Sequence, residues 1–234
     1  MKKVVAGMLT AVMAFSLTAC GGGDASTNDT AKEEGSSDVI TVGFSQVGAE
    51  SDWRTANSQS MKDTFSKENG YDLIFDDAQQ KQENQITAIR NFIQQEVDYI
   101  LLAPVTETGW DTVLQEAKDA GIPVIIVDRM VDVSDDSLYT TWIGTDALLE
   151  GRKAAEWLNA YATAKEIKPE DLHIVDIQGT IGSTAQIGRT QGLEEGVEKY
   201  GWDLLEQQSG EFTQAKGQEV MESMLKKYDN INVV

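Results

Sequence analysis

Short apolar runs alternate with longer stretches of helical periodicity along most of this chain. The runs are rich in β-branched residues and start roughly 30 residues apart, the length of a βαβ unit. In one helical stretch Ile86, Ile89 and Phe92 recur at the spacing of a single helix face. We therefore predict parallel strands at 39–45, 72–76, 99–102 and 123–127, with helices at 53–68, 82–95 and from about 108 to 120.

The alternation pauses and then resumes. Residues 132–136 are acidic and turn-like, and 138–143 form another extended run. A second series follows, with helices at 147–164, 184–200 and 214–228 and strands at 172–177, 203–207 and 231–234. This order predicts an α/β protein with two doubly wound parallel-sheet lobes, 39–143 and 144–234, which cross near 141–146. Because the chain stops on what reads as a strand just starting, we expect the second lobe to be incomplete.

The first 38 residues have a different composition. Lys2 and Lys3 precede an uncharged, mostly apolar run that is short for a membrane span, so residues 1–19 are predicted to be an export signal. Leu17-Thr18-Ala19-Cys20 resembles a bacterial lipobox, in which the cysteine is lipidated. Cys20 is the only cysteine and cannot form an internal disulfide, and lipidation explains it better than a buried thiol. Cys20 and the polar residues up to 38 are predicted to form a lipidated, flexible linker.

Charge and motifs exclude several classes of protein. The formal net charge of −20 opposes binding to nucleic acid or to anionic lipid headgroups. The lone histidine, His173, has no cysteine or second histidine to work with, and it is expected to pack rather than to catalyse. Phosphate-loop, dinucleotide and metal-ligand patterns are missing from the sequence. We expect no metal, no cofactor and no enzymatic activity, although the many acids leave a two-carboxylate glycoside hydrolase open.

Candidate ligand residues follow the predicted strands. Parallel sheets bind ligands at the carboxyl ends of their strands. Glu50, Trp53 and Arg54 follow the first strand, and Asp128 and Arg129 follow the fourth. Carboxylates accept hydrogen bonds from vicinal hydroxyls, guanidinium groups supply several donors, and an aromatic face covers the C–H side of a sugar ring. These residues suit a polyol site, while a solvated surface ion pair is the alternative for adjacent Asp and Arg.

Five longer segments carry a resemblance to a known family. The segments are GFSQVGAESDWRTA (43–56), DAQQKQENQI (77–86), APVTETGWDTVLQEAKDAGIPVIIVDR (103–129), QGTIGSTAQIGRTQG (178–192) and GEFTQAKGQEVMESM (210–224). They resemble the type I periplasmic sugar-binding proteins. This is the family of ribose- and galactose-binding proteins, which shares its fold with the effector domains of lac-type repressors. The resemblance covers about 40–234, and its motifs look most like those of galactofuranose-binding proteins of ABC importers.

The resemblance implies two lobes with a ligand cleft between them and a monosaccharide held in that cleft. It also implies a monomeric extracytoplasmic protein that delivers the sugar to the permease and ATPase of an ABC transporter. The lipid predicted at Cys20 would anchor the protein at the outer face of the plasma membrane, which is the periplasmic side if the cell has an outer membrane, and would be its only membrane contact. Asp52 stands where a small residue is expected, and the family's remaining second-lobe ligands would lie beyond 234. The positions that match the family's ligand residues are Glu50, Ser51, Asp52, Trp53, Arg54, Asp128, Arg129, Arg189 and Phe212.

Two other roles use the same fold. A sensor component that presents sugar to a signalling receptor would have the same binding lobes and a different partner. A transcription regulator is opposed by the predicted signal, the acidic charge and the lack of a helix-turn-helix pattern before the first strand.

Overall fold

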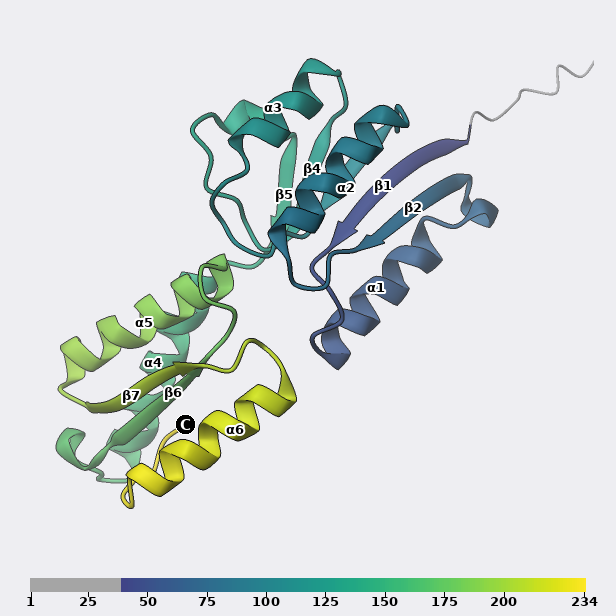
Figure 1. Ribbon diagram of the computed structural model, residues 1–234. Helices are drawn as coiled ribbons and strands as arrows, with labels where there is room; N and C mark the ends of the chain where they lie inside the picture. Colours follow the sequence, from purple (N-terminus) through teal and green to yellow (C-terminus); the bar gives the residue numbers. More distant parts are fainter. Residues whose placement is uncertain (1–38) are drawn as a thin grey trace, which may run out of the picture. The chain divides into compact units, whose positions relative to one another are not determined.

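The computed structural model describes residues 39–234. The predicted signal at 1–19, Cys20 and the predicted linker at 20–38 therefore lie outside the described residues. From residue 40 onward, strands and helices alternate as the sequence indicates (Figure 1). In this part of the chain no helix combines the length and apolar character that crossing a bilayer requires.

Residues 40–144 contain five strands and three α-helices. The strands form a parallel sheet in the order β2-β1-β3-β4-β5, so their carboxyl ends share one edge. Two single-turn 3₁₀ helices, η1 (Lys67–Asn69) and η2 (Asp136–Leu138), lie in the connections. The elements are β1 (Ile40–Gln46), α1 (Asp52–Thr64), β2 (Tyr71–Asp77), α2 (Gln82–Gln94), β3 (Tyr99–Leu102), α3 (Asp111–Asp119), β4 (Val124–Asp128) and β5 (Thr141–Gly144).

Both faces of this first sheet are covered by helices. Side chains alternate along each strand, so Ile100 and Leu102 join the core beneath α2 and α3, whereas Leu101 joins the core on the opposite face with α1. Figure 1 shows α1 on one side of the sheet and α2 on the other. At Gly43 a Cβ would lie 2.5 Å from the ring of Phe92, so this glycine lets α2 approach β1 closely. The predicted doubly wound parallel sheet is confirmed.

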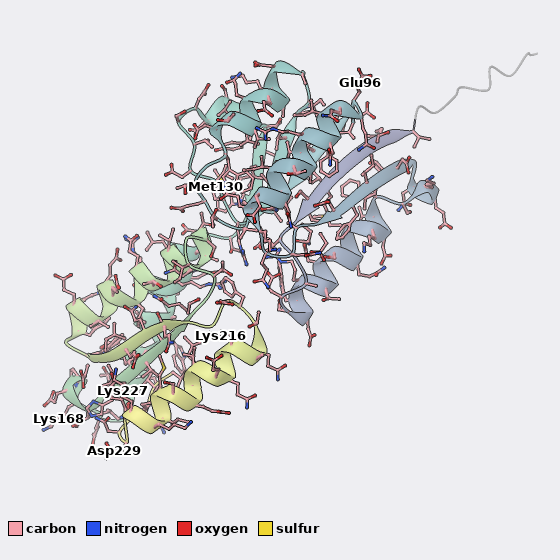
Figure 2. The ribbon with its side chains drawn as sticks, in the orientation of Figure 1. Glu96, Met130, Lys168, Lys216, Lys227 and Asp229 are labelled. Carbon is pink, nitrogen blue, oxygen red and sulfur yellow. The ribbon has the colours of Figure 1, made fainter. Side chains whose placement is uncertain are left out.

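Residues 147–228 form a second parallel sheet with its own helices. It has only two paired strands in the described residues, β6 and β7. Helices α4 and α5 pack on one face with Ile174, and α6 packs on the other with Val175. Figure 2 shows Lys216 and Lys227 near the two ends of α6. The elements are α4 (Ala147–Ala164), η3 (Pro169–Asp171), β6 (His173–Gln178), α5 (Thr184–Tyr200), β7 (Asp203–Ser209) and α6 (Gln214–Lys227).

Helices α4 and α5 touch backbone to backbone. A Cβ on Gly151 would lie 2.7 Å from the carbonyl oxygen of Arg189, and one on Gly192 would lie 2.5 Å from the amide nitrogen of Arg152. Gly188 is equally close to the backbone of α4. Real Cβ atoms do not tolerate such distances, so glycine at these three positions sets how closely the helices pack. The contact brings side chains on the two helices within reach of each other.

Several predicted boundaries are wrong. The helix expected from about 108 begins at Asp111, because Gly109 has a positive φ of 90° and Trp110 turns the chain into the helix. The helix expected to reach 68 ends at Thr64. The strand expected at 231–234 is reduced to a single parallel bridge between Val233 and Ile174, beside β6.

Candidate functional site

All but one of the sequence-predicted ligand residues converge on one pocket of about 340 Å³. The residues around Glu50 follow β1, Asp128 ends β4, Arg189 lies in α5 and Phe212 follows β7. The pocket therefore collects side chains from the carboxyl ends of strands in both sheets, where parallel α/β folds bind ligands. It is lined by Glu50, Ser51, Trp53, Arg54, Asp128, Arg129, Thr145, Glu150, Ala185, Arg189 and Phe212.

Asp52 is the one sequence-predicted residue that does not line this pocket. It is exposed and occupies the first position of α1, where a carboxylate interacts favourably with the helix N-terminus. Its neighbour Ser51 caps the same helix by accepting a hydrogen bond from the backbone amide of Arg54, at 3.2 Å. The cap fixes the entry to α1 and, with it, the start of the Arg54 side chain.

Arg54 and Glu50 form the buried centre of the site. Both side chains are only 2 % exposed, and the Arg54 Nε donates to Glu50 Oε1 at 2.9 Å. The second contact of Arg54 runs from NH2 to Asp128 Oδ2 at 2.7 Å, so the guanidinium joins the segment after β1 to the end of β4. Charge-assisted bonds of this length are among the stronger hydrogen bonds in proteins.

Arg129 adds a second buried guanidinium to the same carboxylate. Its NH2 lies 3.3 Å from Glu50 Oε1, and its NH1 donates to the backbone oxygen of Val105 at 3.2 Å. The guanidinium carbon also lies 4.9 Å from the centre of the Phe212 ring, within the range of a cation–π contact. Burial, followed by the positive charge of Arg54, lowers the pKa of Arg129 to about 10. With 4 % exposure Arg129 is not half of a solvated surface pair.

The backbone at the end of β4 is bent to present Asp128. This residue has a positive φ of 65°, which Asp tolerates better than most side chains do. Its carbonyl oxygen accepts a hydrogen bond from Trp142 Nε1 at 3.1 Å. Gly144 pairs with Asp128 across β4 and β5, and any Cβ there would collide with the Asp128 carbonyl oxygen. A tryptophan donor and a glycine thus hold an unusual conformation beside the pocket.

The second sheet contributes an arginine and an aromatic ring. Arg189 contacts Glu150 Oε2 through both Nε and NH2, each at 3.0 Å. Phe212 has a positive φ of 56°, and its ring lies so close to Gly179 that any Cβ there would displace the ring. Next to the pocket, the backbone amide of Met130 donates to Thr184 Oγ1 at 2.9 Å, which joins the loop after β4 to the first residue of α5.

Two polar atoms at the centre of the site have no partner within the described residues. They are Glu50 Oε2 and Arg54 NH1, and both are buried. An unpartnered buried charge-bearing atom is unfavourable by about 1–3 kcal/mol or more. Trp53 lies beside these atoms, because the centre of its ring is 4.9 Å from the Arg54 guanidinium. Trp53 itself is 58 % exposed. The site therefore offers one free acceptor, one free donor and an exposed aromatic face.

Buried glutamines hold the rim of the first sheet in place. The Gln85 amide donates to the carbonyl oxygen of Ala103 at 2.7 Å and accepts from the amide of Val105 at 2.9 Å. Gln46 accepts from the amide of Val47 and donates to Asn57 on α1. Both glutamines are fully buried, so their hydrogen bonds order the loops after β1 and β3.

The structure adds Thr145, Glu150 and Ala185 to the residues found by sequence reasoning. Of these three, only Glu150 could have been recognised in the sequence, because it is an acid in the first turn of the helix that follows the last strand of the first sheet. A larger hollow of about 510 Å³ lies beside the second sheet, but its lining is mainly apolar. His173 pairs with Asp203 at 2.9 Å outside both linings. Within residues 39–234 no cluster of His, Cys, Asp and Glu could hold a metal ion.

Residues 42–234 match the family model described as periplasmic binding protein domain. The chain is 46 % identical over 192 residues to the galactofuranose-binding protein YtfQ of Escherichia coli K12, covering 82 % of this chain and 58 % of that protein. The chain thus spans less than two thirds of the length of this relative.

Two solved structures are also similar to this chain in sequence and in fold. One, from Mycobacterium smegmatis in complex with β-D-fucofuranose, is 47 % identical with a TM-score of 0.77, covering 83 % of this chain and 63 % of that one. The other is the arabinose ABC transporter's periplasmic binding component from Shewanella sp. ANA-3, bound to L-arabinofuranose. It is 51 % identical with a TM-score of 0.73, and the match covers 80 % of this chain and 60 % of that one. The chain belongs to the periplasmic binding protein family.

Proposed function

We propose that this protein captures a monosaccharide outside the cytoplasm and hands it to an ABC importer. The observation that carries the proposal is the pocket at the strand ends, where Glu50 Oε2 and Arg54 NH1 are buried without partners. A ring with several hydroxyl groups supplies both the donor and the acceptor that these atoms lack. The match to the periplasmic binding protein family supports this reading.

The other pocket residues suit the rest of a sugar. Asp128 accepts from hydroxyls on the first-sheet side, and Arg189 donates from the second-sheet side. The exposed face of Trp53 and the ring of Phe212 cover the apolar C–H faces of the ring. Three relatives bear the names of five-membered sugar rings, galactofuranose, fucofuranose and arabinofuranose, so we take the ligand to be a furanose.

The two sheets belong to lobes that we assign to residues 39–143 and 144–234. A ligand that touches both lobes favours the closed arrangement by the difference between its affinities for the closed and open forms. The closed form is the one that a permease and its ATPase would recognise. Arg189 is central to this, because it reaches the ligand from the second lobe.

A lipid on Cys20 would keep the protein close to that permease. The sequence Leu-Thr-Ala-Cys behind a short apolar run supports lipidation after removal of residues 1–19. Stable anchoring needs more than one acyl chain, which a lipoprotein N-terminus supplies. We therefore place the protein at the outer face of the plasma membrane, and we take it to act as a monomer.

Catalysis is not part of the proposal. Each carboxylate that lines the pocket is ion-paired with an arginine: Glu50 with Arg54, Asp128 with Arg54, and Glu150 with Arg189. A glycoside hydrolase needs a carboxylic acid free to donate its proton to the leaving group. Turnover of aryl glycosides would contradict this part.

Calorimetry of the full-length protein with a panel of free sugars tests the proposal. The panel is D-galactose, L-arabinose, D-ribose and D-fructose, and at least one is expected to bind. The Arg189→Ala variant should bind that sugar about 10- to 150-fold more weakly, since a charged hydrogen bond is worth about 1.5–3 kcal/mol. Its thermal stability should stay near wild type, because the side chain is 50 % exposed. Binding of none of the four sugars would overturn the proposal.

A further inference from the structure

Glu150 is the one carboxylate of the pocket that the sequence did not single out. It lies in the first turn of α4, and it contacts Arg189 on α5 through a single oxygen, Oε2. The Arg189 Nε and NH2 both approach this oxygen at 3.0 Å. The third guanidinium nitrogen, NH1, has no partner among residues 39–234 and is available to a ligand.

The packing of α4 against α5 determines this geometry. Gly151 follows Glu150 directly, and a Cβ on Gly151 would lie 2.7 Å from the backbone oxygen of Arg189 itself. Gly188 precedes Arg189 and is equally close to α4. The two charged residues are therefore flanked by glycines that bring the helices together, and the ion pair forms where the two helix backbones approach closely.

The charges of the pocket explain why Arg189 needs a partner. The pocket is lined by three arginines and three carboxylates. Arg129, which lines the same pocket, has its pKa lowered by burial first and, as smaller contributions, by the charges of Arg54 and Arg189. Without Glu150, Arg189 would face other guanidinium groups with no carboxylate of its own, and its long side chain would be free to turn into solvent.

We propose that Glu150 is a positioning residue that holds the Arg189 guanidinium in the pocket lining before sugar binds. The inference rests on the proposed sugar-binding function and extends it to a residue that need not touch the sugar. An arginine loses considerable rotamer freedom when it is fixed, and fixing it in the free protein leaves less entropy to be lost on binding. The role is in binding and not in stability, because half-exposed ion pairs contribute little to folding.

The chain contains a matched control for this ion pair. Arg152 and Glu195 join the same two helices, with Nε–Oε2 at 2.6 Å and NH2–Oε1 at 3.0 Å. The side chains are 49 % and 39 % exposed, against 50 % and 40 % for Arg189 and Glu150. Neither member of the control pair lines the pocket. A merely structural contribution of an α4–α5 ion pair should therefore appear equally in both.

The test is a double-mutant cycle that combines Glu150→Gln with Arg189→Ala. Binding of the four panel sugars to the full-length protein is measured by calorimetry. Glu150→Gln should bind about 3- to 5-fold more weakly than wild type, as expected for loss of a half-exposed ion pair. Glu195→Gln should bind like wild type, and both variants should melt at similar temperatures. In the Arg189→Ala background, Glu150→Gln should have no further effect on binding.

Three results would overturn the inference. Wild-type affinity in Glu150→Gln would show that Arg189 does not depend on Glu150. The same loss in the Arg189→Ala background would show that Glu150 acts on the sugar by itself and not through Arg189. Binding of none of the panel sugars by the wild type would overturn the sugar-binding function, and this inference with it, whereas the first two results would leave that function intact.

Discussion

Removal of the Glu50 carboxylate should be among the most damaging single changes to this protein. Glu50 Oε1 is shared by Arg54 at 2.9 Å and Arg129 at 3.3 Å, and all three side chains are at most 4 % exposed. Glu50→Ala leaves Arg54 with Asp128 alone and removes the only carboxylate in contact with Arg129 among the described residues. Breaking a buried ion pair by removing one partner destabilises proteins by about 3–5 kcal/mol.

The expected loss is large enough to measure directly. At about 2–4 °C per kcal/mol for a protein of this size, the melting temperature should fall by about 6–20 °C. Urea unfolding followed by far-ultraviolet circular dichroism gives the free energy of unfolding. Glu50→Gln keeps the shape and one oxygen acceptor, so its loss should be smaller.

Glu195→Ala is the control, because its ion pair with Arg152 lies half exposed. It should reduce the free energy of unfolding by no more than about 1 kcal/mol. If Glu50→Ala and Glu195→Ala differ by less than about 1 kcal/mol, the buried charge network does not contribute to stability as its geometry indicates, and the reasoning is refuted.

Three further predictions concern the aromatic contact, a partly buried acid and the lipid. Trp53→Ala should abolish the sugar-induced change in tryptophan fluorescence and leave the fold intact; an unchanged response would assign the signal to another tryptophan. Burial raises the pKa of Asp176, so its ionised form destabilises the fold above that pKa; Asp176→Asn should raise the melting temperature at pH 7, and this gain should shrink as pH falls toward 3.8. An Asp176→Asn variant with no gain at pH 7 would contradict the burial argument. Cys20→Ala should release the protein from membranes or stop its processing, and wild-type membrane fractionation would speak against lipidation.

The fold could be predicted from local patterns because strong sequence signals bound several strands and helices. The apolar run at 124–127 is preceded by Gly121 and Pro123, and the observed strand is Val124–Asp128. The predicted bounds of the helix at 147–164 match those of α4, whose N-cap is Asp146. The errors lie where a tertiary contact decides, as at Trp110, whose buried ring fixes the turn before α3.

The site was only partly accessible to sequence reasoning. Residues at or just after strand ends, such as Asp128 and Arg54, could be found because parallel strands end at one edge, whereas Arg189 lies within α5 and was identified through the resemblance to the family. The burial of Arg129 could not, since it depends on Glu50, a residue 79 positions away. Glu150 was missed for a similar reason, because its partner Arg189 is 39 positions away and meets it only through the glycine contact between α4 and α5.

A crystal structure of the protein with the tightest-binding panel sugar tests the central claim most directly. The sugar is expected in the pocket, with hydroxyl groups on Arg54 NH1 and Glu50 Oε2, a further hydrogen bond to Asp128, and the ring against an aromatic face. Arg189 should reach it from the second sheet. Sugar bound elsewhere in the molecule, with Glu50 Oε2 and Arg54 NH1 still unpartnered, would contradict the account.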